Sequence, residues 1–145
     1  TEYAAWHETL RHDGHHDDKH MRESVDPIVT AGLVDFIDVD HEIAPGIHAE
    51  PSPGHIHVMI ESQGERAVIT GDLMHHPMQC AMPHRHATFD MDRETGSVSR
   101  QAFVDRHTDT GTLVIGMHFS EPTAGHFVRH TAGDTWFRGL GIPDR

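Results

Sequence analysis

The chain has 145 residues, of which 36% are hydrophobic, and its formal net charge at pH 7 is −12 with histidine neutral. That length suits one domain, or part of one, with a modest core. The acidic balance argues against nucleic acid as a partner, because phosphate binding needs a basic patch. No apolar run reaches the ~20 residues that a membrane helix needs. Histidine is the outlier, at 17 residues, and imidazole is the commonest metal ligand.

Cysteine and the first residues say little about the compartment. One cysteine, Cys80, excludes an intrachain disulfide, and we expect it to be a small packed residue rather than a nucleophile. The chain begins Thr1-Glu2-Tyr3, with no initiator Met and no signal-peptide pattern. The localisation is left open by these features, with the cytoplasm favoured.

The first forty residues have helical and then strand-like patterns. Residues 2–11 predict a short amphipathic helix, followed by a wholly polar segment. Ser24 is placed to cap a second helix that runs to about Thr30, and Gly32 is placed to end it. Beyond Gly32 the apolar residues alternate over 33–39, which predicts a strand.

The remaining segments predict a mixture of strands with one long helix. Residues 47–50 form a short predicted strand, and 55–61 with 66–70 form a predicted β-hairpin. A long loop, 73–95, contains two prolines, and long loops in compact domains are often functional. The last predicted elements are a helix at 97–108, a buried strand at 112–116 and a hairpin of 125–130 with 135–138.

Three candidate ligands come directly after a predicted strand or after a Pro-Gly turn. His55 follows Pro53-Gly54, Asp72 follows the strand that ends at Thr70, and His118 follows the strand at 112–116. If these strands lie side by side, the three side chains converge on one rim of the sheet. A His/Asp/His set suits Zn²⁺, Mn²⁺ or Fe²⁺.

The motifs around these residues occur in the order found in a known family. They are Pro51-Ser52-Pro53-Gly54-His55, Ala67-Val68-Ile69-Thr70-Gly71-Asp72 and Leu113-Val114-Ile115-Gly116-Met117-His118-Phe119. The chain resembles the second half of a metallo-β-lactamase-fold hydrolase, from the lactonase and organophosphate-hydrolase-like branch. In that branch Gly-Asp is followed by His-His-Pro, as in residues 71–77. The resemblance implies an α/β fold: residues 1–145 would be one partial domain, the C-terminal half of an αββα sandwich, with a mixed sheet flanked by two or three helices.

The resemblance also implies a dinuclear metal site. His55 would bind the first metal, Asp72 would bridge both, and His118 would bind the second. Two zinc ions are expected, with manganese or iron as alternatives, and a bridging hydroxide would attack an ester or lactone in a small-molecule substrate. Asp72 would also orient the nucleophile or pass a proton to the leaving group, which makes it the catalytic candidate. Phosphotriester hydrolysis is the alternative reaction.

Two departures from the family pattern matter. The His-x-His-x-Asp-His motif expected upstream is missing, and the histidine-rich segment 15–20 does not have its spacing. Secondly, Ile56 and His57 follow His55 directly, where the family pattern has a few more residues. Either His55 or His57 could therefore be the metal ligand. We favour His55, because Ser-Pro-Gly precedes it, and expect His57 to face a sheet surface. His57, His75 and His76 could instead line the pocket or donate a hydrogen bond to a metal ligand. For His75 and His76 the alternative is a set of local hydrogen bonds within the loop.

These departures leave several alternatives. The chain is expected to be a C-terminal fragment, a chain with internal stretches missing, or a half-protein that pairs with another chain. Half a sandwich would expose an apolar sheet face that drives association or aggregation, which favours a larger parent protein. A homo-oligomer is a further expectation. A catalytically inactive metal-binding or interaction module is the second function hypothesis, and a histidine-rich metal buffer with many weak sites is the third. Arg100 resembles an arginine common in the family, and we expect it to form a structural ion pair with Asp90 or Asp92.

Overall fold

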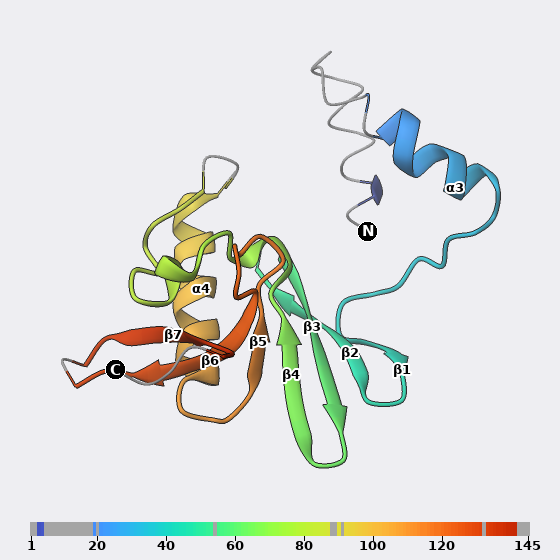
Figure 1. Ribbon diagram of the computed structural model, residues 1–145. Helices are drawn as coiled ribbons and strands as arrows, with labels where there is room; N and C mark the ends of the chain where they lie inside the picture. Colours follow the sequence, from blue (N-terminus) through green and yellow to red (C-terminus); the bar gives the residue numbers. More distant parts are fainter. Residues whose placement is uncertain are drawn as a thin grey trace. The chain divides into compact units, whose positions relative to one another are not determined.

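The computed structural model describes residues 3–4, 19, 21–53, 55–87, 90, 92–131 and 133–141 (Figure 1). The chain forms two compact units, Thr1–Asp38 and Val39–Arg145, and each is considered by itself. That residues 1–145 form a single, partial domain stays a prediction. Within the described residues we find no helix with the length and apolar character that crossing a lipid bilayer requires.

The first unit is built from short helical turns. A π-helical turn, Met21–Val25, leads into α3, Asp26–Thr30, whose first turn contains a proline. Gly32 has φ +68° and its N–H donates to Val29 O, so it ends the helix as predicted. Ser24 lies inside the π-helical turn and is not a cap, which corrects that expectation. Of the predicted helix 2–11 only residues 3 and 4 are described, and both are helical.

The predicted strand at 33–39 is wrong. These residues belong to no strand, and Leu33, Phe36 and Val39 are all exposed. The alternation of apolar residues has the period of a strand, but a strand also needs a partner for its backbone hydrogen bonds. Among the described residues the first strand pairing comes only afterwards, between His41 and Ala49.

The described residues of the second unit form one mixed sheet of seven strands. The strands are β1 (His41–Ala44), β2 (Ile47–Ser52), β3 (His55–Ser62), β4 (Glu65–Ile69), β5 (Leu113–Ile115), β6 (Ala124–Arg129) and β7 (Thr135–Gly139). They lie in chain order across the sheet, and every neighbouring pair is antiparallel except the parallel pair β4–β5. The predicted β3–β4 and β6–β7 hairpins are therefore confirmed, as is the α/β class with a mixed sheet.

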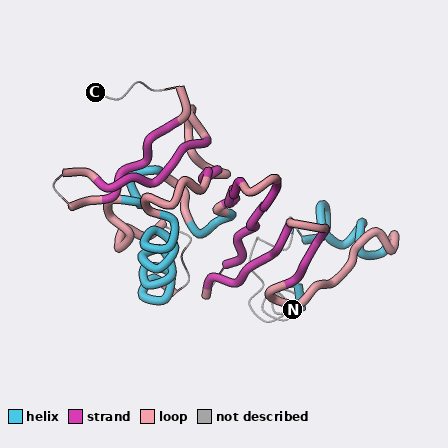
Figure 2. Tube along the Cα trace, turned by 90° about the horizontal axis from the view of Figure 1, so that it is seen from below, coloured by secondary structure: helices cyan, strands magenta, loops and turns pink. Residues whose placement is uncertain are grey.

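The long helix α4, Arg93–His107, supplies the connection that a parallel strand pair requires. Asp92 caps it by accepting a hydrogen bond from the Thr95 N–H at 3.0 Å. This cap starts the helix four residues earlier than the periodicity of its apolar residues predicts. Figure 2 shows α4 on one side of the strands.

The core lies between α4 and one face of the sheet. Alternate residues of the strands point to this face, so Met59, Val68 and Val114 meet Phe103 and Val104 of the helix. The rest of the buried cluster comes from the connections and β6, namely Leu73, Met74, Cys80, Phe119 and Phe127. Cys80 is packed here as expected, and burial raises the pKa of its thiol to about 11.

The predicted long loop, 73–95, begins at the last residue of a short 3-10 turn, Gly71–Leu73 (η2), and contains a second one, Pro77–Cys80 (η3). The helix α4 then begins at Arg93, inside the predicted loop. The segment is held to the helix by Arg100, whose Nη2 donates to Asp90 Oδ2 at 2.8 Å. Both side chains are buried. The predicted structural ion pair of Arg100 is thus confirmed, with Asp90 rather than Asp92 as its partner.

Candidate metal centre

The candidate ligands come together because three strand ends share one edge of the sheet. β4 and β5 are parallel, with Ile69 opposite Ile115, so the segments that follow them leave from the same edge. Asp72 lies on the first of these segments and His118 on the second. β3 is antiparallel to β4, with Val58 opposite Ile69, and continuing this register sets position 55 beside position 72.

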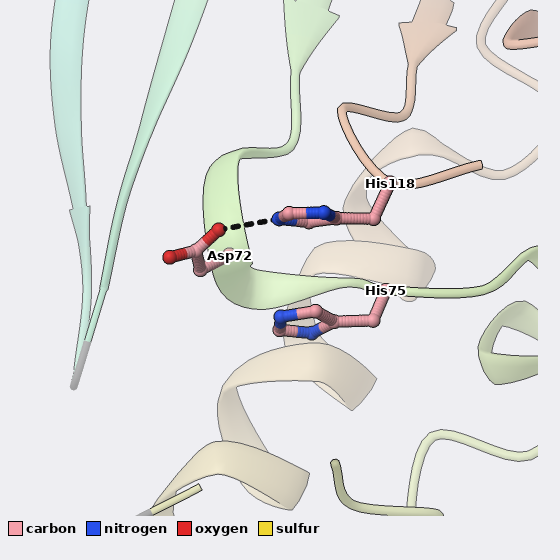
Figure 3. A group of neighbouring side chains, drawn as sticks. All are labelled: Asp72, His75 and His118. Atoms are coloured by element: carbon pink, nitrogen blue, oxygen red, sulfur yellow. Dashed lines mark hydrogen bonds and ion pairs between the residues drawn. The ribbon is translucent and has the colours of Figure 1, made fainter. Parts of the chain in front are cut away.

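Asp72, His75 and His118 form a compact group at this edge (Figure 3). One nitrogen or oxygen atom from each side chain lies within 4.8 Å of the others. His118 Nε2 is 2.7 Å from Asp72 Oδ1. The imidazole rings of His75 and His118 stack with centroids 4.6 Å apart and planes 13° apart. The group therefore combines a strand-end carboxylate with two imidazoles from separate segments.

A glycine sets the local path of the chain before Asp72. Gly71 has φ +53°, and a Cβ atom added there would lie 2.6 Å from the carbonyl oxygen of Ile56 on β3. Only glycine fits this close approach of two backbones in that conformation. The preceding residue, Thr70, still donates its N–H to Ile115 O at 3.0 Å. The turn therefore begins where the ladder with β5 ends, and it directs Asp72 to the edge of the sheet.

The pKa values of Asp72 and His75 are both lowered, but for different reasons. A hydrogen bond with His118 is the main cause that holds the pKa of the Asp72 carboxyl below its usual value, and the charges of His118, His75 and His55 act in the same direction. Burial, followed by the charge of His118, lowers the pKa of His75. The side chains of Asp72 and His118 are 62% and 44% exposed, so a small molecule can reach them.

The remaining predicted residues have separate positions. His55 begins β3 on the same edge and its charge reaches Asp72, but it is outside the compact group. His57 is only 4% exposed; its Nδ1 is 2.7 Å from Ser52 Oγ and its ring meets Phe103 edge-on. Its imidazole thus faces α4, the sheet-surface role expected for it. His76 Nδ1 accepts a hydrogen bond from the Met78 N–H at 3.0 Å, which is a local loop contact.

His75 is the residue whose place the sequence left open. The structure puts it in the compact group and not in a purely local contact. The available signal was its spacing in Gly71-Asp72-Leu73-Met74-His75, which puts it one short turn after the carboxylate. The histidine-rich segment 15–20 lies outside the described residues, apart from Lys19.

The donor set limits the chemistry that the group can support. Two imidazole nitrogens and one carboxylate oxygen are ligands that Zn²⁺, Mn²⁺ and Fe²⁺ accept, and sites with three protein ligands leave a position for water or substrate. The atoms lie close enough to one another to contact one ion. Without a metal, the same Asp72–His118 pair is an acid–base couple.

Comparisons with known proteins identify the fold. No family model matches the chain, and a search of curated proteins found no match. Among solved structures, one described as hydrolase AbOPH in the beta lactamase superfamily has a TM-score of 0.76 and 18% sequence identity, over 87% of this chain and 45% of that chain. AidC, described as a dizinc quorum-quenching lactonase in complex with a product, N-hexnoyl-L-homoserine, has a TM-score of 0.67 and 16% identity, over 86% of this chain and 48% of that one.

A third structure belongs to a probable metal-dependent hydrolase from Staphylococcus aureus. Its TM-score is 0.59 at 18% identity, over 77% of this chain and 42% of that chain. The chain therefore has the fold of β-lactamase-superfamily hydrolases, and it spans about half the length of the structures that it matches. The resemblance predicted from the sequence motifs is confirmed at the level of the fold.

Proposed function

We propose that this chain contributes the C-terminal part of a metal-dependent hydrolase that cleaves an ester or lactone bond in a small molecule. The observation that carries the proposal is the compact group of Asp72, His75 and His118 at the common edge of β4 and β5, in which Asp72 and His118 are exposed. Its donor set suits a hydrolytic metal and its exposure suits a substrate. The hydrolases with this fold support the same reaction class.

Asp72 is the central ligand in this proposal. His118 and His75 lie beside its carboxylate and would share one ion with it. His55 lies near Asp72 at the start of β3, so it would hold a second ion together with Asp72. Two zinc ions are expected, since one solved structure with this fold is described as dizinc. Further ligands would come from outside the described residues.

The residues of this chain prepare the reaction in two ways. The hydrogen bond with His118 orients the Asp72 carboxylate and holds the pKa of its carboxyl below the usual value. An ionised carboxylate at this place can accept a proton from the attacking water and later deliver it to the leaving group. When bound, the metal supplies an activated water and polarises the carbonyl of the substrate.

A lactone is the substrate class that we favour, because AidC is described as a lactonase with a bound product. The activity is proposed for the whole protein to which this chain belongs, since the chain spans about half of each matched structure.

Metal content and hydrolysis test the proposal together. We expect purified protein to bind zinc stoichiometrically, His118→Ala to lose at least half of that zinc, and hydrolysis of an N-acyl homoserine lactone to fall with it. His41→Ala, an exposed histidine on β1, is the matched control and should retain both properties. A phosphotriester assayed in parallel separates the alternative reaction. No bound zinc, or zinc that is unchanged in His118→Ala, would contradict the proposed site.

A further inference from the structure

Two buried polar side chains, Gln79 and Arg100, contact the backbone of the segment 72–76. Neither of them belongs to the metal-binding group. Gln79 is 4% exposed and Arg100 is 0% exposed. Burying an amide or a guanidinium is costly unless its polar atoms are hydrogen-bonded. The partners of these two side chains therefore indicate what they hold in place.

Gln79 makes hydrogen bonds at both ends of its amide. Its Oε1 accepts from the backbone N–H of His75 at 2.7 Å and from that of His76 at 3.1 Å. Its Nε2 donates to the carbonyl oxygen of Arg85 at 2.7 Å. Only this orientation of the amide matches two donors on one side with an acceptor on the other. Gln79 thus fixes the backbone of His75 directly.

Arg100 acts on the same segment from helix α4. Its Nη1 is 3.5 Å from Leu73 O, and its Nε donates to Pro83 O at 2.9 Å. Asp90 holds the guanidinium through Nη2 at 2.8 Å. Leu73 lies between Asp72 and His75, so Arg100 contacts the backbone inside the ligand-bearing segment.

Gln79 and Arg100 connect the same two backbone segments. Each bonds to the ligand-bearing segment on one side and to the segment 83–85 on the other, through Pro83 O and Arg85 O. The stacking of His75 on His118 requires the backbone at 75 to stay at a set distance from the β5 edge. Small shifts of that backbone would separate the ligand atoms, which lie within 4.8 Å of one another.

We propose that Gln79 and Arg100 are positioning residues, which hold the segment 72–76 so that His75 stacks on His118 next to Asp72. This inference rests on the proposed function, because it assigns the two residues to the same metal-binding group. Substitution of a group that orients a metal ligand through a hydrogen bond typically lowers the metal affinity 10–100-fold.

Gln79→Met is the main test, because methionine has a similar length but cannot accept the His75 N–H bond. Zinc affinity would be measured by competition with a chelator on the full chain, and the visible absorption of bound Co²⁺ would report the number and arrangement of ligands. We expect an affinity loss of roughly 10-fold or more and a changed Co²⁺ spectrum. Gln79→Glu keeps an acceptor for the His75 N–H, so it should recover most of the affinity.

The control is Gln101→Met on α4, the helix that carries Arg100. Gln101 is exposed and its Nε2 bonds to Asp105, so this variant should match the wild type. Arg100→Lys keeps the charge opposite Asp90 but loses the fork that reaches Leu73 and Pro83, and we expect it to weaken zinc binding as well. Arg100→Lys tests the inference if Gln79→Met does not fold.

Three outcomes are distinguishable. Wild-type affinity and an unchanged Co²⁺ spectrum in folded Gln79→Met, or in Arg100→Lys if that variant alone folds, would overturn the inference and leave the proposed function standing. Absence of metal binding in the wild type would overturn both. Weaker binding and an altered spectrum in the two variants, together with wild-type behaviour of Gln101→Met, would support the inference.

Discussion

Gly71 illustrates how a single residue decides whether the ligands meet. Its φ of +53° and the carbonyl oxygen of Ile56, 2.6 Å from where a Cβ would lie, leave no room for a side chain. Gly64, in the β3–β4 turn, also has a positive φ but has no atom within 4 Å of that position. The two glycines therefore separate conformational strain from steric conflict.

We expect Gly64→Ala to lose about 1–2 kcal/mol of unfolding free energy, the cost of a left-handed conformation for an L-residue. Gly71→Ala should lose more, because alanine also forces β3 and the Asp72 turn apart, and it should weaken zinc binding. Urea unfolding and zinc competition measure the two effects. Equal losses in both variants would show that the approach of Ile56 does not constrain the turn.

Helix α4 shows how burial competes with the electrostatics of an element. His107 is its last residue, where the partial negative charge of the helix end favours a protonated imidazole. Its ring is nevertheless buried against Phe103, with centroids 4.6 Å apart. Burial, followed by the charges of Arg106 and His57, lowers the pKa of His107 to about 4, although Glu50 acts in the opposite direction. Desolvation is thus the stronger effect at this helix end.

This shift predicts a loss of stability in acid. Between pH 6.5 and about 4 the unfolded chain binds a proton at His107 that the folded chain does not. The unfolding free energy should therefore fall as the pH is lowered through that window, by up to ~1.4 kcal/mol per pH unit from this residue, and return as the pH rises. His107→Leu should show a shallower pH dependence in urea unfolding, whereas the exposed-site variant His41→Leu should keep the wild-type slope. Identical slopes in all three proteins would contradict this assignment.

At the scale of the whole molecule, the two units differ in how many buried residues each contains. Every residue of the hydrophobic core cluster lies between Met59 and Phe127, within the unit Val39–Arg145. Among the described residues of Thr1–Asp38 none is buried. Since burial of apolar surface is the main favourable term in folding, the sheet unit should account for the cooperative unfolding of the chain.

We therefore expect a chain of residues 39–145 to unfold cooperatively in urea, with a midpoint close to that of the full chain. Far-ultraviolet circular dichroism should keep its β-sheet component, because all seven strands lie in this unit. A truncated chain without a cooperative transition would show that residues 1–38 contribute to the core.

The elements recovered from the sequence were those with a local signal. The β3–β4 and β6–β7 hairpins have clear turns, and Gly32 stops its helix where a left-handed residue is needed. The strand expected at 33–39 failed because alternation specifies a face but not a partner. Ser24 has the chemistry of a cap, yet the helical turn begins before it, at Met21.

The sequence by itself determined which residues are chemically able to act as ligands, namely His55, Asp72 and His118, and it predicted an ion pair of Arg100 with Asp90 or Asp92. Only the tertiary structure decided which of them meet. Asp72 and His118 are 46 residues apart, and the parallel pairing of β4 with β5 places them 2.7 Å from each other. The same packing stacks His75 on His118 and turns His57 toward α4. Local patterns record the periodicity and turns of a segment, whereas contacts between distant segments depend on how their faces pack.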